Sequence, residues 1–592
     1  MSKLKSSGQQ TADAPTPEDA FHEAAALEDH PSAPRGSKAD GPVLSADGTP
    51  LKRSLNRALR MQKLRALMLI APLLIFVLVT FIAPIADMLF RSVENQIVSN
   101  TLPRTTQALA GWEAEGADSA PPEAAYEALY VDLFLAAEAK EHTRLGTRLN
   151  YEETGLSSLF RSSGRDMDDI GEDRIDALED ANEAWEEEGF WYTLMTGGEG
   201  AAGNTALLDE QRDRLEALTG DSYAADIGFV PGQAISELLP RTARAYAAFA
   251  LYTVVEDEDI VAEEEPWERV KIALTQDLRD PATVQALADY DGPGAEELRA
   301  AADLSGGFEE IDFKQTFLEI DEDWGNVDNW QTIKMYSPPF TSGYFLNAVD
   351  MEKTPDGPAL RDEDERIYGL LFNRTLFMSL VITGCCIMLG YPVAWLLANL
   401  PMRTANILMI LVLLPFWTSL LVRTSAWKVM LQQQGVINDT LVWLGLVDDA
   451  SRLIMINNQF GTIVAMTHIL LPFMILPMYS VMQTIPPSYV RAARSLGATN
   501  WTSFWRVYFP QSVPGIGAGS ILVFILSIGY YITPEIVGGT TGTFISNRIA
   551  YHISSSLNWG LAAALGSILL AVVLILYWAY DKIVGIDNVK LG

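Results

Sequence analysis

The residues best suited to chemistry in this sequence lie within or beside long apolar stretches. Glu535 and Arg423 are the ionisable candidates, because a charge is costly in an apolar setting and is retained there for a function. Aromatic rings nearby could hold a cationic solute through their faces. The aromatic candidates are Trp417, Trp427, Tyr530 and Tyr531. We take these six residues as a candidate translocation path, while anchoring at a membrane interface remains an open alternative.

Several common chemistries are missing from the sequence. It holds no Gly-x-x-x-x-Gly-Lys-Ser/Thr loop, so no cradle for ATP phosphates is predicted and energy is expected to come from another chain. The five His residues are scattered, without metal-ligand spacing to Cys or to one another. We therefore predict no catalytic residue, no metal and no cofactor on this chain. His468, inside an apolar stretch, is expected to hydrogen-bond a neighbouring helix.

Charge is strongly segregated along the 592 residues, whose formal net charge is −34. Residues 94–366 hold 61 acidic and 20 basic residues, whereas the remainder is mildly basic. Such an acidic chain is not expected to bind nucleic acid. Cys385 and Cys386 are adjacent in an apolar run and cannot build a disulfide framework. Residues 1–50 lack a sustained apolar period and are predicted to be a disordered tail.

Six apolar stretches are long enough to cross the roughly 30 Å of hydrocarbon in a bilayer. They cover residues 67–90, 375–397, 405–427, 461–484, 515–537 and 559–580. Each must be helical, because an open strand in lipid leaves its backbone groups unpaired. Prolines such as Pro392 and Pro415 predict kinks. The predicted fold class is therefore an all-α polytopic membrane protein with about six spans.

The positions of Lys and Arg predict the orientation, since cytoplasmic loops carry the excess of both. Residues 51–93 comprise a basic segment and the first span, and no acidic residue interrupts the basic residues from Lys52 to Arg65. The N-terminus is therefore placed in the cytoplasm. Alternation then places the C-terminus inside as well and residues 94–366 outside. We predict a multi-pass protein of the bacterial inner membrane, in contact with lipid.

The long segment between the first two spans is predicted to be a folded, mainly helical domain, because it far exceeds an ordinary connection. Residues 234–255 and 282–302 show helical spacing, with glycine joints near 197–203 and 292–294. Its expected core aromatics are Trp185, Trp191, Trp267, Trp324 and Trp330. The acidity could concentrate a cationic solute or steer a binding protein, or only keep an exposed domain soluble.

A predicted cytoplasmic loop, 486–515, reads PPSYVRAARSLGATNWTSFWRVYFPQSVPG. Ser488 is expected to cap a short helix that ends at Gly497. Thr499 or Asn500 is expected to cap a second helix that ends at Pro510. Ala492 and Ala493 leave one face low enough for another protein to approach, while Arg491 and Arg494 offer polar contacts. An ordinary amphipathic interfacial helix is the alternative.

This loop resembles the conserved cytoplasmic loop of ABC importer permeases, whose pattern is Glu-Ala-Ala, three residues, Gly, nine residues, Ile-x-Leu-Pro. The spacing is intact, with Arg491, Val507 and Phe509 replacing the Glu, Ile and Leu. The matching positions are Arg491, Ala492, Ala493, Gly497, Val507, Phe509 and Pro510. In that family the loop is a coupling helix that docks in a groove of the ATPase subunit.

Three further segments, 391–395, 414–427 and 532–535, resemble spermidine/putrescine-type permeases. The resemblance covers residues 51–93 and roughly 325–592, so the core at 367–592 lies within it and most of the acidic insert does not. It implies a type I ABC importer permease architecture that moves a polyamine or related cation. The implied partners are ABC ATPase subunits that carry ATP and Mg, a second permease and a periplasmic solute-binding protein.

Other functions remain as alternatives to polyamine import. Relatives of this subfamily carry other small solutes, such as amino-acid derivatives, opines, iron or thiamine-like compounds. A secondary transporter would be expected to show paired halves and buried acidic relays, which these spans do not offer. A membrane-anchored sensor or enzyme would place its activity in the insert, but such an anchor rarely needs five further spans.

Overall fold

The computed structural model describes residues 51–113, 119–198 and 200–584, and the tail predicted at 1–50 lies outside these residues. The chain divides into two compact units, residues 1–84 and 85–592. The structure is 73% helical, which confirms the predicted all-α class. Among the described residues, the only sheet is an antiparallel hairpin formed by β1 (Met351–Thr354) and β2 (Gly357–Leu360).

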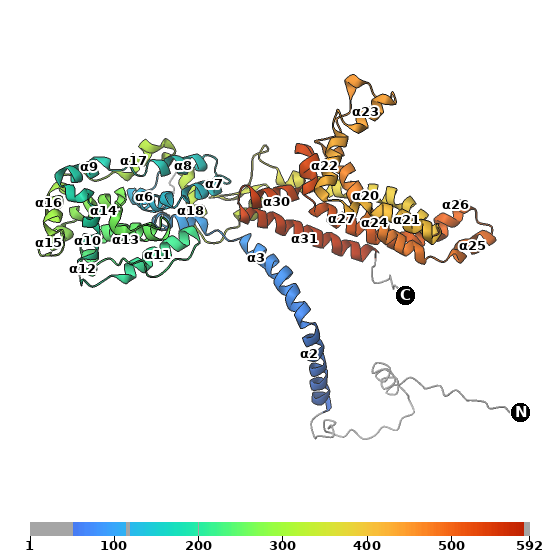
Figure 1. Cartoon of the computed structure of the whole chain (residues 1–592), viewed down its shortest axis with the longest axis horizontal. Coiled ribbons are helices and arrows are strands. Elements are labelled where there is room, and N and C mark those ends of the chain that lie inside the picture. Colours follow the sequence, from blue (N-terminus) through green and yellow to red (C-terminus); the bar gives the residue numbers. More distant parts are fainter. Residues whose placement is uncertain (1–50, 114–118, 199, 585–592) are drawn as a thin grey trace. The chain divides into compact units, whose positions relative to one another are not determined.

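The first predicted span is a continuous helical segment (Figure 1). It consists of α2 (Leu51–Val77), the π-helical turn η1 (Leu78–Ile82) and α3 (Ala83–Arg91). Within η1 the Thr80 hydroxyl donates to the Phe76 carbonyl over 2.7 Å. Such back-bonding to a carbonyl one turn earlier often accompanies a local distortion of a helix.

Five helices among the described residues are long and apolar enough to cross a membrane, or six if one bent pair counts as a span. The second, fourth and sixth predicted spans correspond to α20 (Tyr368–Asn399), α24 (Gln459–Thr484) and α31 (Trp559–Val584). The Asn458 side chain caps α24 by accepting from the Gly461 amide over 3.0 Å. These three predictions are confirmed, although α20 begins seven residues before the predicted start at 375.

The third predicted span, 405–427, is wrong as a continuous helix. It comprises α21 (Met402–Leu413), the 3₁₀ turn η5 (Leu414–Trp417) and α22 (Leu420–Leu431), with a bend of 94° at the break. Pro415 cannot donate a backbone hydrogen bond, and both Thr418 and Ser419 adopt extended backbone angles. The sequence after α22 continues through α23 (Val436–Trp443) and η6 (Asp449–Ser451) to α24.

The fifth predicted span, 515–537, is displaced toward the N-terminus. The continuous helical segment runs from Asn500 to Gly529, because Tyr530 is extended and starts a break in the helix. It is built from α26 (Asn500–Ser503), η7 (Phe504–Tyr508) and α27 (Phe509–Gly529). The chain then continues through α28 (Ile532–Val537), α29 (Gly539–Gly542) and α30 (Ile545–Ser554).

The centre of the C-terminal helical core is formed by α20, α24 and α27, which pack against one another (Figure 1). Gly515 and Gly519 lie on the face of α27 that meets α24. A Cβ added to Gly519 would lie 3.1 Å from the Met474 carbonyl oxygen, closer than ordinary contact, so glycine lets the two backbones approach. Small residues of this kind let helix backbones come close in membranes, where dispersion contacts drive association.

The insert is a folded, mainly helical domain, as predicted (Figure 1). Its first part contains α4 (Ile97–Thr101), α5 (Pro103–Leu109), α6 (Glu123–Glu138), α7 (His142–Leu149), α8 (Leu156–Arg165), α9 (Glu172–Ala181), η2 (Glu183–Glu186) and α10 (Glu188–Thr196). Its second part contains α11 (Thr205–Thr219), α12 (Gln233–Leu238), α13 (Pro240–Val255), η3 (Val261–Glu263), α14 (Glu268–Arg279), α15 (Pro281–Leu287), α16 (Ala295–Ser305), α17 (Phe313–Ile320), η4 (Glu322–Gly325) and α18 (Val327–Met335). It ends with α19 (Gly343–Asn347).

The insert contains two copies of one helical motif, which we call the first repeat (residues 96–196) and the second repeat (residues 233–335). The first begins QIVSNTLPRT and the second QAISELLPRT. In both, a proline opens a helix, α5 or α13, whose first amides are capped by a buried aspartate from the next long helix. Asp132 accepts from the Thr105 amide over 2.9 Å, and Asp277 from the Thr242 amide over 2.8 Å. Equivalent geometry at equivalent positions supports an internal duplication.

Each repeat ends with two tryptophans six residues apart, Trp185 and Trp191 or Trp324 and Trp330. In both, the second indole donates to the backbone carbonyl of the first, over 2.9 Å and 2.8 Å respectively. All four side chains are at most 1% exposed, and Trp267 packs against both clusters that they enter. The five tryptophans expected in the core are therefore confirmed there.

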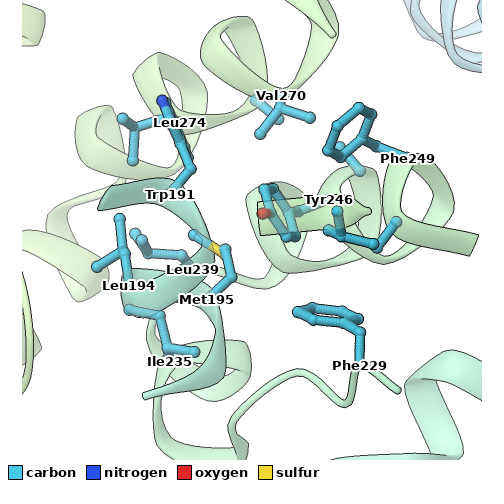
Figure 2. Close-up of a cluster of buried hydrophobic side chains, with 14 of the residues drawn as sticks. Trp191, Leu194, Met195, Phe229, Ile235, Leu239, Tyr246, Phe249, Val270 and Leu274 are labelled. Atoms are coloured by element: carbon cyan, nitrogen blue, oxygen red, sulfur yellow. The ribbon is translucent and has the colours of Figure 1, made fainter. Parts of the chain in front are cut away.

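The tryptophans at the end of each repeat pack into the hydrophobic core of the other repeat, an arrangement we call the exchange of the tryptophan pairs. Trp324 packs with Phe160 of the first repeat, and its indole donates to the Ser163 hydroxyl over 2.7 Å. Trp191 packs in turn among residues of the second repeat, and Figure 2 shows it beside Tyr246 and Leu274. Neither hydrophobic core is complete without a segment from the other repeat.

A half-buried acid at the end of α6 makes the stability of the insert depend on pH. Burial, with Asp168, Glu268 and Asp257 nearby, raises the pKa of Glu138 to about 7. The folded state therefore binds the proton of the Glu138 carboxyl more tightly than the unfolded state does. The stability that this difference contributes is present below about pH 4.5 and is lost as the pH rises through 7. Glu138→Gln should leave the free energy of unfolding unchanged at pH 4 and raise it by about 1 kcal/mol at pH 8, allowing for solvent screening.

Chemical denaturation of the full chain in detergent, followed by tryptophan fluorescence at both pH values, measures this effect. A matched substitution at exposed Glu172 provides the baseline. Equal effects of Glu138→Gln at the two pH values would contradict the assignment.

Candidate functional site

The candidate coupling loop begins with α25 (Pro487–Ser495), which follows α24 directly. The predicted Ser488 cap is wrong, because Pro486 is the cap residue and no side chain bonds to the helix start. Pro487 occupies the first helical position, where the fixed φ of proline matches the helix. A backbone N–H at that position would have no partner within the helix, so its absence costs nothing. Ser488 is thus already inside the helix.

Gly497 ends α25 in the predicted manner. Its φ is +91°, a left-handed conformation that glycine adopts without steric cost. The Ala498 amide donates to the Ala493 carbonyl over 3.1 Å, and the Gly497 amide to the Arg494 carbonyl over 3.0 Å. These two bonds form a Schellman motif, which satisfies carbonyls at the end of the helix. Thr499 then caps α26 by accepting from the Thr502 amide over 3.2 Å, as predicted.

Pro510 does not stop the second helix. The chain passes from α26 through the π-helical turn η7 into α27, in which Pro510 occupies the first turn. A π-helical turn changes the register of the backbone bonds, so the missing N–H of a proline just after it is tolerated. The coupling loop therefore continues directly into a membrane helix instead of ending at a separate joint.

The tip of this loop exposes apolar side chains. Leu496 is 90% exposed and Trp501 72% exposed, and Tyr489 on α25 is also largely exposed. Arg491 and Arg494 are exposed, whereas Ala493 is half-buried. An exposed apolar group bordered by cations is typical of a surface that another protein covers.

The inner side of the loop is anchored to the membrane helices by aromatic contacts. Phe504 and Phe509 lie against Tyr391 of α20, with ring centroids 6.2 Å and 5.8 Å apart. The Tyr391 hydroxyl also lies 3.0 Å from the Ser512 hydroxyl of α27. Val507, between the two phenylalanines, is half-buried. Packed aromatic rings therefore connect the loop directly to α20 and α27.

Three of the six candidate path residues gather around His468 of α24. The Trp427 indole nitrogen donates to His468 Nδ1 over 3.1 Å, which confirms the expected bond between helices. Arg423, one turn earlier in α22, is close enough to His468 and Tyr530 for its charge to act on both. Arg423 donates through Nη2 to the Thr418 carbonyl over 3.1 Å at the break in the third span.

Glu535 and Tyr531 form a second group around Asn547 of α30. The Asn547 side-chain amide donates to Glu535 Oε2 over 2.6 Å and to the Tyr531 carbonyl over 2.9 Å. Glu535 is exposed, so its carboxylate is held in place yet remains open to a solute. A fixed carboxylate can form a strong, charge-assisted hydrogen bond with a cationic solute.

Trp417 is not brought into either group. It is 70% exposed at the end of η5, and no hydrogen bond or ring contact joins it to the other five in the described part of the chain. Sequence analysis also left Asn547 out of the path. No motif marks it, since a single Asn in a short helix is compatible with many roles.

The match to known families covers the part of the chain that contains these two groups and the loop. A family model described as "Binding-protein-dependent transport system inner membrane component" matches residues 387–584. The spermidine/putrescine transport system permease protein PotB of Escherichia coli K12 is 33% identical over 220 residues, which cover 37% of this chain and 79% of that protein.

The chain belongs to this family. The inner membrane ABC transporter permease protein YdcU of Escherichia coli K12 is 32% identical over 222 residues, covering 36% of this chain and 70% of that protein. A crystal structure of a bacterial alginate ABC transporter, in complex with a periplasmic protein bound to an alginate pentasaccharide, matches with a TM-score of 0.30. Its sequence identity is 20%, over 36% of this chain and 77% of that chain. That similarity is too low to support an argument.

The protein is therefore an ABC importer permease, a transport subunit of the membrane and not an enzyme. This membership favours the permease over the alternatives of a secondary transporter and a membrane-anchored enzyme. The residues matched by the family model begin at 387, so the acidic insert lies outside the match.

Proposed function

We propose that this permease moves a polyamine or a related small cation from a periplasmic binding protein across the bacterial inner membrane. The observation that carries the proposal is the 33% identity with permeases named for spermidine and putrescine. Glu535, oriented by Asn547 and open to solvent, supports a cationic solute. The positive charge of Arg423 is unfavourable for a cation, so we assign solute contact to the Glu535 group.

Two ABC ATPase subunits, which bind ATP and Mg, engage the α25–Gly497–α26 loop and that of a second, related permease. This assignment places both termini and the loop in the cytoplasm and the insert outside. ATP binding draws the ATPases together and pushes the loop, and the contacts of Phe504 and Phe509 with Tyr391 pass the movement to α20. The exposed Leu496 and the intact family spacing from Ala492 to Pro510 support this mechanism.

Uptake into proteoliposomes tests the proposed solute. The permease is reconstituted with its ATPase, its companion permease and its binding protein, and labelled spermidine, putrescine, an opine, Fe(III) and thiamine are supplied in turn. We expect ATP-dependent uptake of a polyamine, reduced about tenfold by Glu535→Gln through loss of a charge-assisted contact. Asp449→Asn, which changes an exposed carboxylate 75% accessible between α23 and α24, serves as the matched control. Uptake of a neutral or anionic solute alone would overturn the proposal.

A further inference from the structure

The strongly acidic insert contains a cavity that is lined by arginines. Its volume is about 240 Å³, and it lies where α5 and α6 of the first repeat meet α13 and α14 of the second. Arg104, Arg241, Arg244 and Arg269 line it, with Glu127 as the one carboxylate among the lining residues. Arg104 and Arg241 occupy the same position of the duplicated LPRT segment, so the duplication itself brings two of these cations together.

The central observation is that Arg269 is buried at this cavity without a protein partner. Its side chain is only 8% exposed, yet it has no hydrogen bond and no ion pair within the described part of the chain. Burial lowers the pKa of Arg269 to about 10, so it remains charged at neutral pH. A largely buried charge without a protein partner is costly, so an anion that enters the cavity and pairs with it is favoured.

Three carboxylates near the cavity, Asp132, Asp277 and Glu210, already have protein partners. Asp132 Oδ2 accepts from the Arg104 amide, the Thr105 amide and the Thr105 hydroxyl. Asp277 caps α13 in the same way and lies 3.9 Å from Arg241. Arg244 pairs with Glu210 over 3.2 Å, at a site where both side chains are partly exposed. These contacts leave Arg269 and Arg104 without side-chain partners among the described residues.

A second buried donor lines the same cavity. The Tyr130 hydroxyl is buried and has no hydrogen-bond partner in the described chain, and it lines the cavity together with Arg269. A phenol O–H and guanidinium N–H groups are donors, and guanidinium groups fit the paired oxygens of carboxylate and phosphate. The cavity is smaller than the pockets that hold drug-sized ligands.

We propose that this cavity binds a small multivalent oxyanion, phosphate, sulfate or a short dicarboxylate, between the two repeats of the insert. The anion pairs with Arg269 and Arg104 and accepts from Tyr130. Because it contacts Arg104 of α5 in the first repeat and Arg269 of α14 in the second, it neutralises the repulsion between these two cations and holds the repeats together. The acidity of the remaining insert disfavours anions elsewhere on this domain, so binding is confined to the cavity.

Binding and unfolding are measured on the full chain in detergent at constant ionic strength, with chloride as the reference. Phosphate, sulfate and succinate are each titrated by calorimetry, and insert unfolding is followed by tryptophan fluorescence. We expect saturable binding of at least one oxyanion, with a rise in the unfolding midpoint. Arg269→Gln should weaken binding by about tenfold or more, because it removes a charge-assisted contact. Arg104→Gln, at a half-buried position, should weaken it as well.

The unfolding midpoint measured in chloride, without oxyanion, separates anion binding from a purely structural role of Arg269. Because Arg269 lacks a protein partner, Arg269→Gln should not lower the unfolding midpoint in chloride, whereas loss of a structural arginine would lower it. Arg161→Gln, on an exposed part of α8, is the matched control and should bind as the unaltered chain does. The inorganic anions and succinate distinguish a phosphate-like from a carboxylate ligand. No response of the unaltered chain to any oxyanion, or equal responses in Arg161→Gln and Arg269→Gln, would overturn the proposal.

Discussion

Leu496→Asp should abolish ATP-driven uptake by the reconstituted importer while leaving the permease folded. Leu496 is 90% exposed at the end of α25, so the substitution removes no internal contact. On docking to an ATPase, the leucine would bury an apolar side chain worth about 1.5–3 kcal/mol, and aspartate would also carry an unpaired charge into the contact. The expected loss of transport is therefore more than about tenfold.

Uptake and ATPase activity are measured together in proteoliposomes, with circular dichroism as the check on folding. Leu446→Asp supplies a matched control, because Leu446 is 69% exposed beyond α23 and lies outside the coupling loop. Normal transport by Leu496→Asp would remove the loop from the coupling mechanism. Equal loss in both variants would point to a general effect of surface charge.

Trp324→Ala should destabilise the insert by about 3–5 kcal/mol, the usual cost of removing a buried tryptophan. Trp324 is fully buried, contacts Phe160, and accepts from the Tyr126 hydroxyl through its carbonyl over 2.9 Å. Both of those partners belong to the first repeat. The exchanged packing therefore predicts that a change in the second repeat loosens α6 and α8 of the first.

Hydrogen exchange on the full chain locates this effect. Protection should fall first in α6 and α8, with α13 and α14 following. Trp501→Ala, at a site 72% exposed on α26, should change stability by no more than about 0.5 kcal/mol. Early loss of protection in α13 instead of α6 would contradict the exchange of the tryptophan pairs.

Local features of this permease were predictable because local chemistry determines them. Gly497 ends α25 since only a left-handed residue completes the Schellman bonds, and that requirement is visible in the sequence. The break in the third span was not predictable in the same way. Thr418 and Ser419 interrupt the apolar run by only two residues. Hydropathy alone therefore predicts one continuous span through them.

Features formed by distant residues were missed for a different reason. Asn547 reaches Glu535 and the Tyr531 carbonyl only after α28 and α30 have packed, so its role depends on tertiary structure. The repeats of the insert did leave a signal, in QIVSNTLPRT and QAISELLPRT, which a search for internal similarity would have found. The exchange of the tryptophan pairs left no signal in the sequence. Each pair would have the same neighbours in sequence whether it packed in its own repeat or in the other one.

The exchange also determines when the first core of the insert can be completed during synthesis. Tyr126 must wait for the Trp324 carbonyl, which lies 198 residues later in the chain. At typical rates of translation that delay is roughly ten to forty seconds. During this time the nascent first repeat exposes an unfinished apolar surface, so the cell must protect it from aggregation until the ribosome has delivered the missing segment.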